Sequence, residues 1–160
     1  MKTKIIFYSY SGNTRKVASV LSNYLKEKNY EVDFIDLEAL DESNSFLGQC
    51  RRAFSKTKAL IKETNFDLAN YDLICISTPI WAFKPAPAVN TFLDKCFNLE
   101  NKKIILFSTY GSGTGNTKCL NYMEDLLKKK GAKEFARFSV QQFKVKDIDF
   151  IRDLLLTLNF

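Results

Sequence analysis

Two kinds of apolar segment alternate along the chain, and this alternation restricts the fold more than any other feature of the sequence. Short β-type segments are each followed by a longer segment whose apolar residues recur at helical spacing. The predicted strands are residues 4–8, 30–37, 72–77, 103–108 and 135–140, and the predicted helices are residues 13–28, 46–61, 86–97, 116–130 and 147–158. Five strands that are each followed by a helix predict an α/β fold, an open parallel sheet with helices on both faces.

Length and composition fit one folded domain. The chain has 160 residues, 46% of them hydrophobic, and it lacks internal repeats, low-complexity tracts and linkers. Because domains typically run to about 100–150 residues, we expect residues 1–160 to form a single domain. No apolar run approaches the roughly 20 residues that a membrane helix requires. The basic start is followed by an apolar run too short for a signal peptide, which predicts a cytoplasmic protein without membrane insertion.

The residue types limit the chemistry that the chain can perform unaided. The four cysteines are widely spaced and form no Cys-x-x-Cys pair, so we predict free, buried thiols and no metal site. Histidine is absent, which removes the commonest general base and the commonest metal ligand. We therefore assign no catalytic side chain, and we expect a bound cofactor to carry any chemistry.

The chain is basic, with 24 lysine and arginine residues against 18 aspartate and glutamate residues and a net charge of +6. A basic chain can indicate a nucleic-acid partner. However, the lysine run at residues 128–130 falls at the end of a predicted helix, where cations complement the helix dipole. No basic stripe interleaved with aromatic residues is present, so we predict no nucleic-acid partner.

Three unusual segments follow the first, third and fourth predicted strands: residues 9–14, 78–84 and 109–115. In open parallel sheets, ligands bind beyond the carboxyl ends of the strands, where the strand order reverses. We therefore expect the three segments to converge on one site.

The first segment combines small hydroxyl residues with a glycine at a helix start. Unpaired backbone N–H groups and the helix dipole favour an anion there. Ser9, Ser11 and Thr14 can donate from their hydroxyl groups. Asn13 can donate from its amide, and Gly12 lets the chain approach a phosphate closely. The alternative is an ordinary capped helix, since neither the triphosphate-binding P-loop nor the dinucleotide motif is present.

The other two segments could hold a flat heterocycle. Residues 78–84 carry Trp81, the only tryptophan, which could stack on a flat ring system. The alternative is a tryptophan packed beneath a surface loop. Residues 109–115 contain three of the six glycines, so backbone N–H groups there could donate to the carbonyl groups of a heterocycle. The alternative is a flexible surface loop.

Together the three segments resemble the cofactor-binding loops of the flavodoxin family. Residues 9–14 are similar to its phosphate loop, residues 78–81 to its first flavin loop, and the segment from residue 109 to its second. The resemblance covers the whole chain and implies a three-layer sandwich, a five-stranded parallel sheet of order 2-1-3-4-5, and non-covalently bound FMN. The residues that it assigns to the cofactor are Ser9, Tyr10, Ser11, Gly12, Asn13, Thr14, Thr78, Pro79, Ile80, Trp81, Ala82, Phe83, Thr109, Tyr110, Gly111 and Gly115.

Two departures from the family pattern are informative. Flavodoxins commonly carry a glycine beside the flavin N5 atom, whereas Ala82 and Phe83 occupy that neighbourhood here. We therefore expect a backbone with positive φ to be less accessible. Typical flavodoxin carriers are also acidic, so a docking partner of this basic chain would differ from the usual one.

The resemblance implies an FMN-binding redox protein that transfers electrons between partner proteins. The alternative is an NAD(P)H-dependent reductase of quinones or other small acceptors that uses the same FMN. A phosphorylated receiver module of the same topology is disfavoured, because Ser9, Ser11 and Ser77 occupy the positions of its clustered acids. We expect either a monomer or a homodimer.

Overall fold

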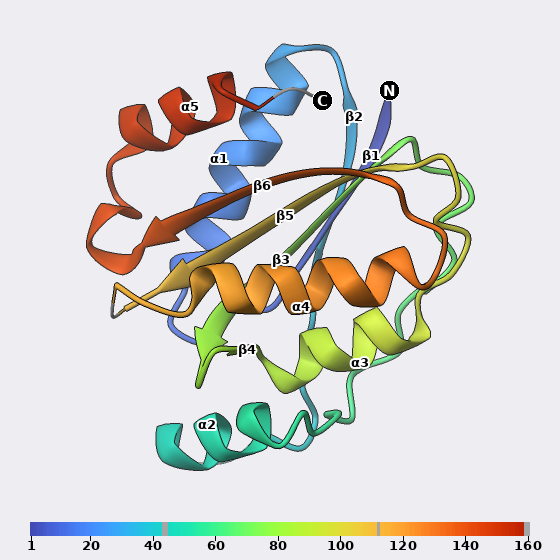
Figure 1. Cartoon of the computed structure of the whole chain (residues 1–160). Helices are drawn as coiled ribbons and strands as arrows, with labels where there is room; N and C mark the ends of the chain where they lie inside the picture. Colours follow the sequence, from blue (N-terminus) through green and yellow to red (C-terminus); the bar gives the residue numbers. More distant parts are fainter. Residues whose placement is uncertain (43–44, 112, 159–160) are drawn as a thin grey trace.

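A computed structural model describes residues 1–42, 45–111 and 113–158 of the chain. The elements in chain order are β1 (Lys2–Phe7), α1 (Asn13–Glu27), β2 (Glu31–Asp36), α2 (Phe46–Phe54), β3 (Leu73–Trp81), β4 (Lys84–Pro85), α3 (Pro87–Lys95), β5 (Lys103–Tyr110), α4 (Asn116–Lys128), β6 (Glu134–Gln141), the 3₁₀ turn η1 (Gln142–Lys144) and α5 (Ile148–Leu156). The parallel strands lie in the order β2-β1-β3-β5-β6, and β4 pairs antiparallel with the end of β3 (Figure 1). The predicted parallel order 2-1-3-4-5 is confirmed, and β4 is an additional short strand.

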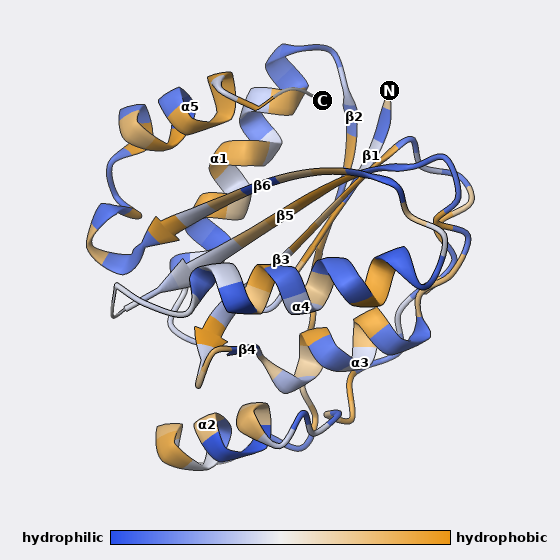
Figure 2. Cartoon of the chain, viewed as in Figure 1, coloured by the Kyte–Doolittle hydropathy of each residue, from blue (hydrophilic) through white to orange (hydrophobic). Residues whose placement is uncertain are grey.

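Helices cover both faces of the sheet, so the molecule has three layers. α1 and α5 lie on one face, whereas α3 and α4 lie on the other, with α2 beyond α3 (Figure 1). Successive residues of a strand enter different cores. Ile5 and Phe7 belong to the core beneath α1, and Ile6 and Tyr8 belong to the core beneath α3 and α4. The central strands are therefore apolar along most of their length (Figure 2), as strands buried on both faces are.

Two strands extend further than their apolar patterns indicate. Residues 78–81 were predicted as part of a loop, but β3 continues to Trp81 because its end pairs with β4. β5 likewise continues to Tyr110, which pairs with Gln141 of β6. The carboxyl ends of these strands carry polar and proline residues that pairing with distant strands holds in an extended conformation.

One predicted helix is shorter in the structure than expected, and the predicted cap of another is confirmed. The helix predicted over residues 46–61 ends at Phe54, because Lys56 takes a φ of 53°, which a right-handed helix cannot continue. The predicted cap of the last helix is confirmed: Asp147 Oδ1 accepts a hydrogen bond from the Phe150 N–H at 3.1 Å. This bond, together with the Lys144 ammonium, lowers the pKa of Asp147.

The four cysteines are free thiols, as predicted. Cys75, Cys96 and Cys119 are buried, and Cys50 is half-buried. Burial raises the pKa of the Cys96 thiol to about 11, so this thiol stays protonated and unreactive. In the part of the chain that the structure describes, no helix is long and apolar enough to cross a membrane.

A buried lysine lies within β1. Lys4 is 1% exposed; its ammonium donates to the Asn65 carbonyl oxygen at 3.1 Å and lies 5.1 Å from the centre of the Tyr71 ring. The Tyr71 hydroxyl donates to Asp33 Oδ2 at 2.6 Å. Burial lowers the pKa of Lys4, and nearby carboxylates partly offset that effect. This cluster joins β1 and β2 to the segment that precedes β3.

The Tyr71–Asp33 bond makes stability depend on pH in the alkaline range. Burial and the hydrogen bond to Asp33 raise the pKa of Tyr71 from 10.0 to about 12. The neutral phenol therefore stabilises the folded state fully at a pH below 10.0, the ordinary pKa of tyrosine. This contribution is lost as the pH rises through about 12, the pKa of Tyr71 in the folded protein. We expect the free energy of unfolding, measured by urea denaturation, to fall more steeply across this window in the wild type than in Tyr71→Phe. Tyr30→Phe should follow the wild type, and equal slopes for wild type and Tyr71→Phe would contradict the assignment.

Candidate functional site: a cavity at the carboxyl ends of the parallel strands

A cavity of about 290 Å³ opens where β1, β3 and β5 end. The residues that line it are Tyr10, Ser11, Asn13, Phe46, Pro79, Ile80, Trp81, Thr109, Tyr110, Gly111 and Gln142. The structure therefore brings together the three segments that follow the first, third and fourth predicted strands. These segments lie far apart in the sequence, but they meet in space because the parallel strands that precede them end at the same edge of the sheet.

The β1–α1 loop, residues 9–14, has the backbone geometry of an anion site. Gly12 precedes α1 with a φ of 82° and has no side chain that could cap the helix. A Cβ on Gly12 would meet no described atom within 4 Å, so the space above the loop is open. The first turn of α1 carries no acidic residue, so the helix dipole is free to favour an external anion. Ser11 and Asn13, whose side chains offer a hydroxyl and an amide donor, also line the cavity.

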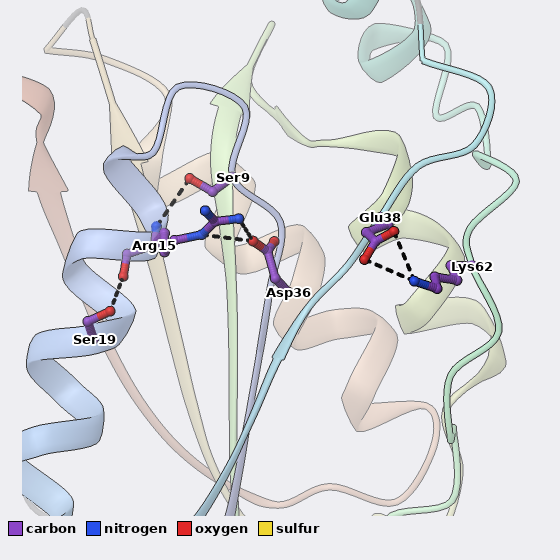
Figure 3. A network of polar contacts seen from close by, with 6 residues as sticks. All are labelled: Ser9, Arg15, Ser19, Asp36, Glu38 and Lys62. Carbon is purple, nitrogen blue, oxygen red and sulfur yellow. Dashed lines mark hydrogen bonds and ion pairs between the residues drawn. The ribbon is translucent and has the colours of Figure 1, made fainter.

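Arg15 is held at the start of α1 by hydrogen bonds with three residues, Ser9, Ser19 and Asp36 (Figure 3). Its backbone N–H donates to Ser9 Oγ at 3.2 Å, and its Nε donates to Asp36 Oδ2 at 2.9 Å. Ser19 Oγ donates to the Arg15 carbonyl oxygen at 2.9 Å. Because Asp36 ends β2, the Arg15–Asp36 pair joins the edge strand to the loop. Ser9, a predicted phosphate donor, accepts from Arg15 and does not line the cavity.

Thr14 joins the same loop to β5. Its Oγ1 lies 2.8 Å from Thr109 Oγ1, and both side chains are buried. Thr14 was predicted to contact the cofactor, but its hydroxyl is bonded within the protein and only Thr109 lines the cavity.

Aromatic rings form one wall of the cavity. Trp81 is 4% exposed, and the rings of Tyr8, Tyr10 and Phe46 surround it at centroid distances of 5.7, 5.6 and 6.1 Å. The three rings stand nearly perpendicular to the indole, at 83°, 85° and 87°, an arrangement that aromatic pairs favour. Trp81 is thus a buried part of the cavity wall, whereas Tyr10 and Phe46, at 47% and 57% exposure, present more accessible surface to a ligand.

The β3–β4 hairpin turns beside that wall. Trp81 pairs with Lys84, which leaves Ala82 and Phe83 as the two central residues of the turn, with φ values of 46° and 65°. Turns with two left-handed central residues normally carry Asn-Gly. The expectation that positive φ is less accessible here is wrong, because both residues already adopt it. Each non-glycine residue in this region costs about 1–2 kcal/mol, so the hairpin stores strain next to the cavity.

Two glutamines hold the segment after β5. Gln141 Nε2 donates to the Gly111 carbonyl oxygen at 3.0 Å. The Gln142 side chain lies 3.4–3.5 Å from the position that a Cβ on Gly111 would take. Gln142 also lines the cavity, which places its amide group beside the exposed Gly111 backbone. Ser112, within the predicted third segment, lies outside the described residues.

Nine of the sixteen predicted site residues line the cavity, and seven do not. The seven that do not line it are Ser9, Gly12, Thr14, Thr78, Ala82, Phe83 and Gly115. Thr78, for example, accepts the Ala86 N–H on its Oγ1 at 2.9 Å and so fixes the approach to α3. Sequence reasoning missed Phe46 and Gln142. Gln142 follows the last predicted strand, so the same strand-end rule could have found it; no local signal distinguishes Phe46.

The lining contains no carboxylate, lysine, arginine or thiol among the described residues. No group of histidine, cysteine, aspartate or glutamate in the described part of the chain could hold a metal ion. Instead, hydroxyl, amide and backbone N–H donors lie at one end, flat apolar surfaces in the middle, and an exposed glycine backbone at the other. This combination of groups fits a ligand that has a phosphate, a planar ring system and a polar ring edge, as FMN has.

Fold and site together define a flavodoxin-like flavoprotein that binds FMN. The chain belongs to the NADPH-dependent FMN reductase family, whose sequence model matches residues 1–145. The predicted family resemblance and the predicted cofactor are thereby confirmed. No curated protein matches the sequence.

Solved structures share this fold. A flavoprotein from Lactobacillus acidophilus NCFM, crystallised in complex with FMN, is 24% identical with a TM-score of 0.67 over 92% of this chain and 98% of that one. Oxidised flavodoxin 1 from Bacillus cereus is 20% identical, with a TM-score of 0.64 over 99% of this chain and 100% of that one. An NADH:FMN oxidoreductase in its apo form is 18% identical, with a TM-score of 0.62 over 99% and 91%.

The Thr14–Thr109 bond can be tested by a pair of substitutions. Thr14→Val keeps the shape but leaves the buried Thr109 hydroxyl without its partner, so we expect the free energy of unfolding to fall by about 1–3 kcal/mol in urea denaturation. Thr14→Val/Thr109→Val removes both hydroxyls and should recover most of this loss. Thr117→Val, in the exposed first turn of α4, is the control. A double variant no more stable than Thr14→Val would contradict the pairing.

Proposed function

We propose that this protein is an oxidoreductase in which NADPH reduces the bound FMN and a quinone or another small acceptor takes the electrons. One observation carries the proposal: in a chain of the NADPH-dependent FMN reductase family, the exposed rings of Tyr10 and Phe46 stand at the cavity. Such rings offer flat surfaces against which a second planar molecule can lie. Bound FMN supplies the redox chemistry, since it accepts a hydride and releases electrons singly or in pairs.

The chain's own residues would bind and orient the cofactor. The N-terminus of α1, with the Ser11 hydroxyl and the Asn13 amide, would hold the phosphate. Ile80 and the buried Trp81 would contact the ring system and keep water from one side of it. The Gly111 backbone, with Gln142 beside it, would meet the polar ring edge.

Charge supports NADPH as the reductant. The chain carries a net charge of +6, and NADPH carries two more negative charges than NADH through its additional phosphate. A basic surface raises the rate at which an anionic ligand arrives, more so at low salt. Three buried free thiols also suit a reducing compartment such as the cytoplasm.

The second candidate function is electron transfer between partner proteins. Its support is the exposure of apolar residues on two segments that contribute to the cavity: Phe46 and Leu47 of α2 are 57% and 80% exposed, and Phe83 of the hairpin is 47% exposed. Apolar patches beside a cofactor site are typical of docking surfaces. In this case the bound FMN would receive electrons from a protein, and NADPH alone would reduce it slowly.

Turnover separates the two functions. The protein is loaded with FMN, and the oxidation of NADPH and of NADH is followed with a benzoquinone as acceptor. The proposal predicts continuous turnover with NADPH that stops when the acceptor is omitted under anaerobic conditions. Reduction of bound FMN by NADPH in a single slow event, with no turnover, would instead support the carrier.

The phosphate assignment predicts a selective loss of affinity. Ser11→Ala removes a hydroxyl donor to a charged acceptor, so we expect FMN to bind about tenfold more weakly, as the loss of a hydrogen bond to a charged group implies. Riboflavin has no phosphate, so its dissociation constant should not change. Ser19→Ala, one helical turn or more away on α1, is the matched control. An equal loss for FMN and riboflavin would place the phosphate elsewhere.

A further inference from the structure

Phe83, in the β3–β4 turn, lies directly against Gly115, which precedes α4. A Cβ on Gly115 would collide with Phe83 Cδ1 and would lie 3.1 Å from Phe83 Cε1. Gly115 also has a φ of 97°, in the left-handed region. The close approach of the Phe83 ring is therefore possible only because position 115 carries no side chain.

The contact joins two segments that each contribute a wall of the cavity. Phe83 follows Trp81 by two residues, and Gly115 follows Gly111 by four. Trp81 and Gly111 line the cavity, whereas Phe83 and Gly115 do not. The contact thus connects the two segments at residues that do not themselves line the cavity.

Other contacts hold the hairpin to α4 on the same side. Lys118 Nζ of α4 lies 5.6 Å from the centre of the Phe83 ring. Lys84 Nζ of the hairpin lies 4.6 Å from the centre of the Tyr122 ring of α4. Ammonium groups at such distances from a ring are attracted to it. A strained turn persists only where its surroundings hold it, and α4 supplies that support here.

We propose that Phe83 and Gly115 form a clamp that sets the spacing between the hairpin and the segment after β5, and that this spacing determines how FMN is held. The proposal rests on the placement of FMN in this cavity under the proposed function. Both are positioning residues, because each acts through a neighbour that lines the cavity. A change in the clamp should therefore alter the affinity and the redox potential of bound FMN without removing any group that touches it.

A simpler role for Gly115 is to supply a positive φ at the start of α4. Asparagine separates the two roles, because it tolerates the left-handed region better than most residues but brings a Cβ into the Phe83 ring. In a Phe83→Ala background the ring is gone, and the same asparagine has room. The clamp therefore predicts that the effects of the two substitutions are coupled, whereas a requirement for φ alone predicts that they add.

The experiment compares wild type, Gly115→Asn, Phe83→Ala and the double variant. The readouts are the dissociation constant of FMN, the midpoint potential of the bound FMN and the melting temperature of the protein without FMN. We expect Gly115→Asn to weaken FMN binding about tenfold in the wild-type background and by less than about threefold in the Phe83→Ala background, as coupled neighbours do. The midpoint potential should shift in Gly115→Asn and return in the double variant towards that of Phe83→Ala.

Gly113→Asn is the matched control. Gly113 belongs to the same segment, but a Cβ there would meet no described atom within 4 Å. This variant should keep the FMN affinity, midpoint potential and melting temperature of the wild type. A loss of affinity equal to that of Gly115→Asn would overturn the clamp, because any side chain in the segment would then have the same effect.

The remaining outcomes are also decisive. Equal effects of Gly115→Asn in both backgrounds would overturn the clamp, as would Phe83→Ala with unchanged affinity and potential. If Gly115→Asn does not fold, recovery of folding and of FMN binding in the double variant supports the clamp, and failure to recover overturns it. A wild type that binds no FMN would overturn the proposed function and the clamp together. A wild type that binds FMN but shows no coupling overturns the clamp alone.

Discussion

The hydrogen-bonded register among the parallel strands β3, β5 and β6 is the constraint on which the site depends. Pro79 of β3 pairs with Thr109 of β5, and Tyr110 pairs with Gln141 of β6. Because the strands are parallel, their carboxyl ends stop at the same edge of the sheet, and the residues that follow emerge side by side. A shift of one residue would turn each side chain to the opposite face and would move the Thr109 hydroxyl away from Thr14. The position of the cavity is therefore determined first by strand pairing, and the loops then supply its lining residues.

The helices that begin at this edge follow residues that do not cap them, whereas α2 and α5 follow capping residues. α1 and α4 each follow a left-handed glycine, Gly12 or Gly115, which has no side chain to cap the helix. Other side chains accept one N–H in each first turn: Ser9 Oγ accepts from Arg15 of α1, and Asn116 Oδ1 accepts from Thr117 of α4. By contrast, Ser45 precedes α2 and Asp147 precedes α5, and each side chain accepts an N–H group from the first turn of its helix. A capping residue satisfies one N–H group of the first turn, whereas a glycine in its place leaves these groups to acceptors outside the helix, such as Ser9 or a ligand. The Arg15–Asp36 pair adds rigidity here without placing a carboxylate in the first turn of α1.

The sequence predicted the fold because local pattern and global topology agree in this chain. Nearly continuous apolar strands followed by amphipathic helices admit few arrangements, and the confirmed parallel order is one of them. The three site segments were predicted because strand-end position and unusual composition coincide at residues 9–14, 78–84 and 109–115. What the sequence did not show depends on long-range pairing. The β4 strand exists only because residues 84–85 pair with the end of β3, and no apolar pattern marks a two-residue strand.

Long-range contacts also account for the differences between the predicted and the observed positions of the site residues. Thr14 and Ser9 look like ligand donors in the sequence, but their partners Thr109 and Arg15 are visible only in three dimensions. Phe46 reaches the cavity from α2 through the packing of rings around Trp81. Ala82 and Phe83 adopt positive φ against their intrinsic preference because strand pairing and α4 enforce it.

Trp81 offers the most direct measurement of the central claim, since it is the only tryptophan in the chain and lies in the cavity wall. The protein without cofactor is titrated with FMN while the tryptophan emission is recorded. If FMN binds in this cavity, the ring system comes into contact distance of the indole, and the emission should be quenched to a plateau at one FMN per chain. Binding of FMN at that stoichiometry with unchanged tryptophan emission would contradict the account, because the cofactor would then lie away from the aromatic wall.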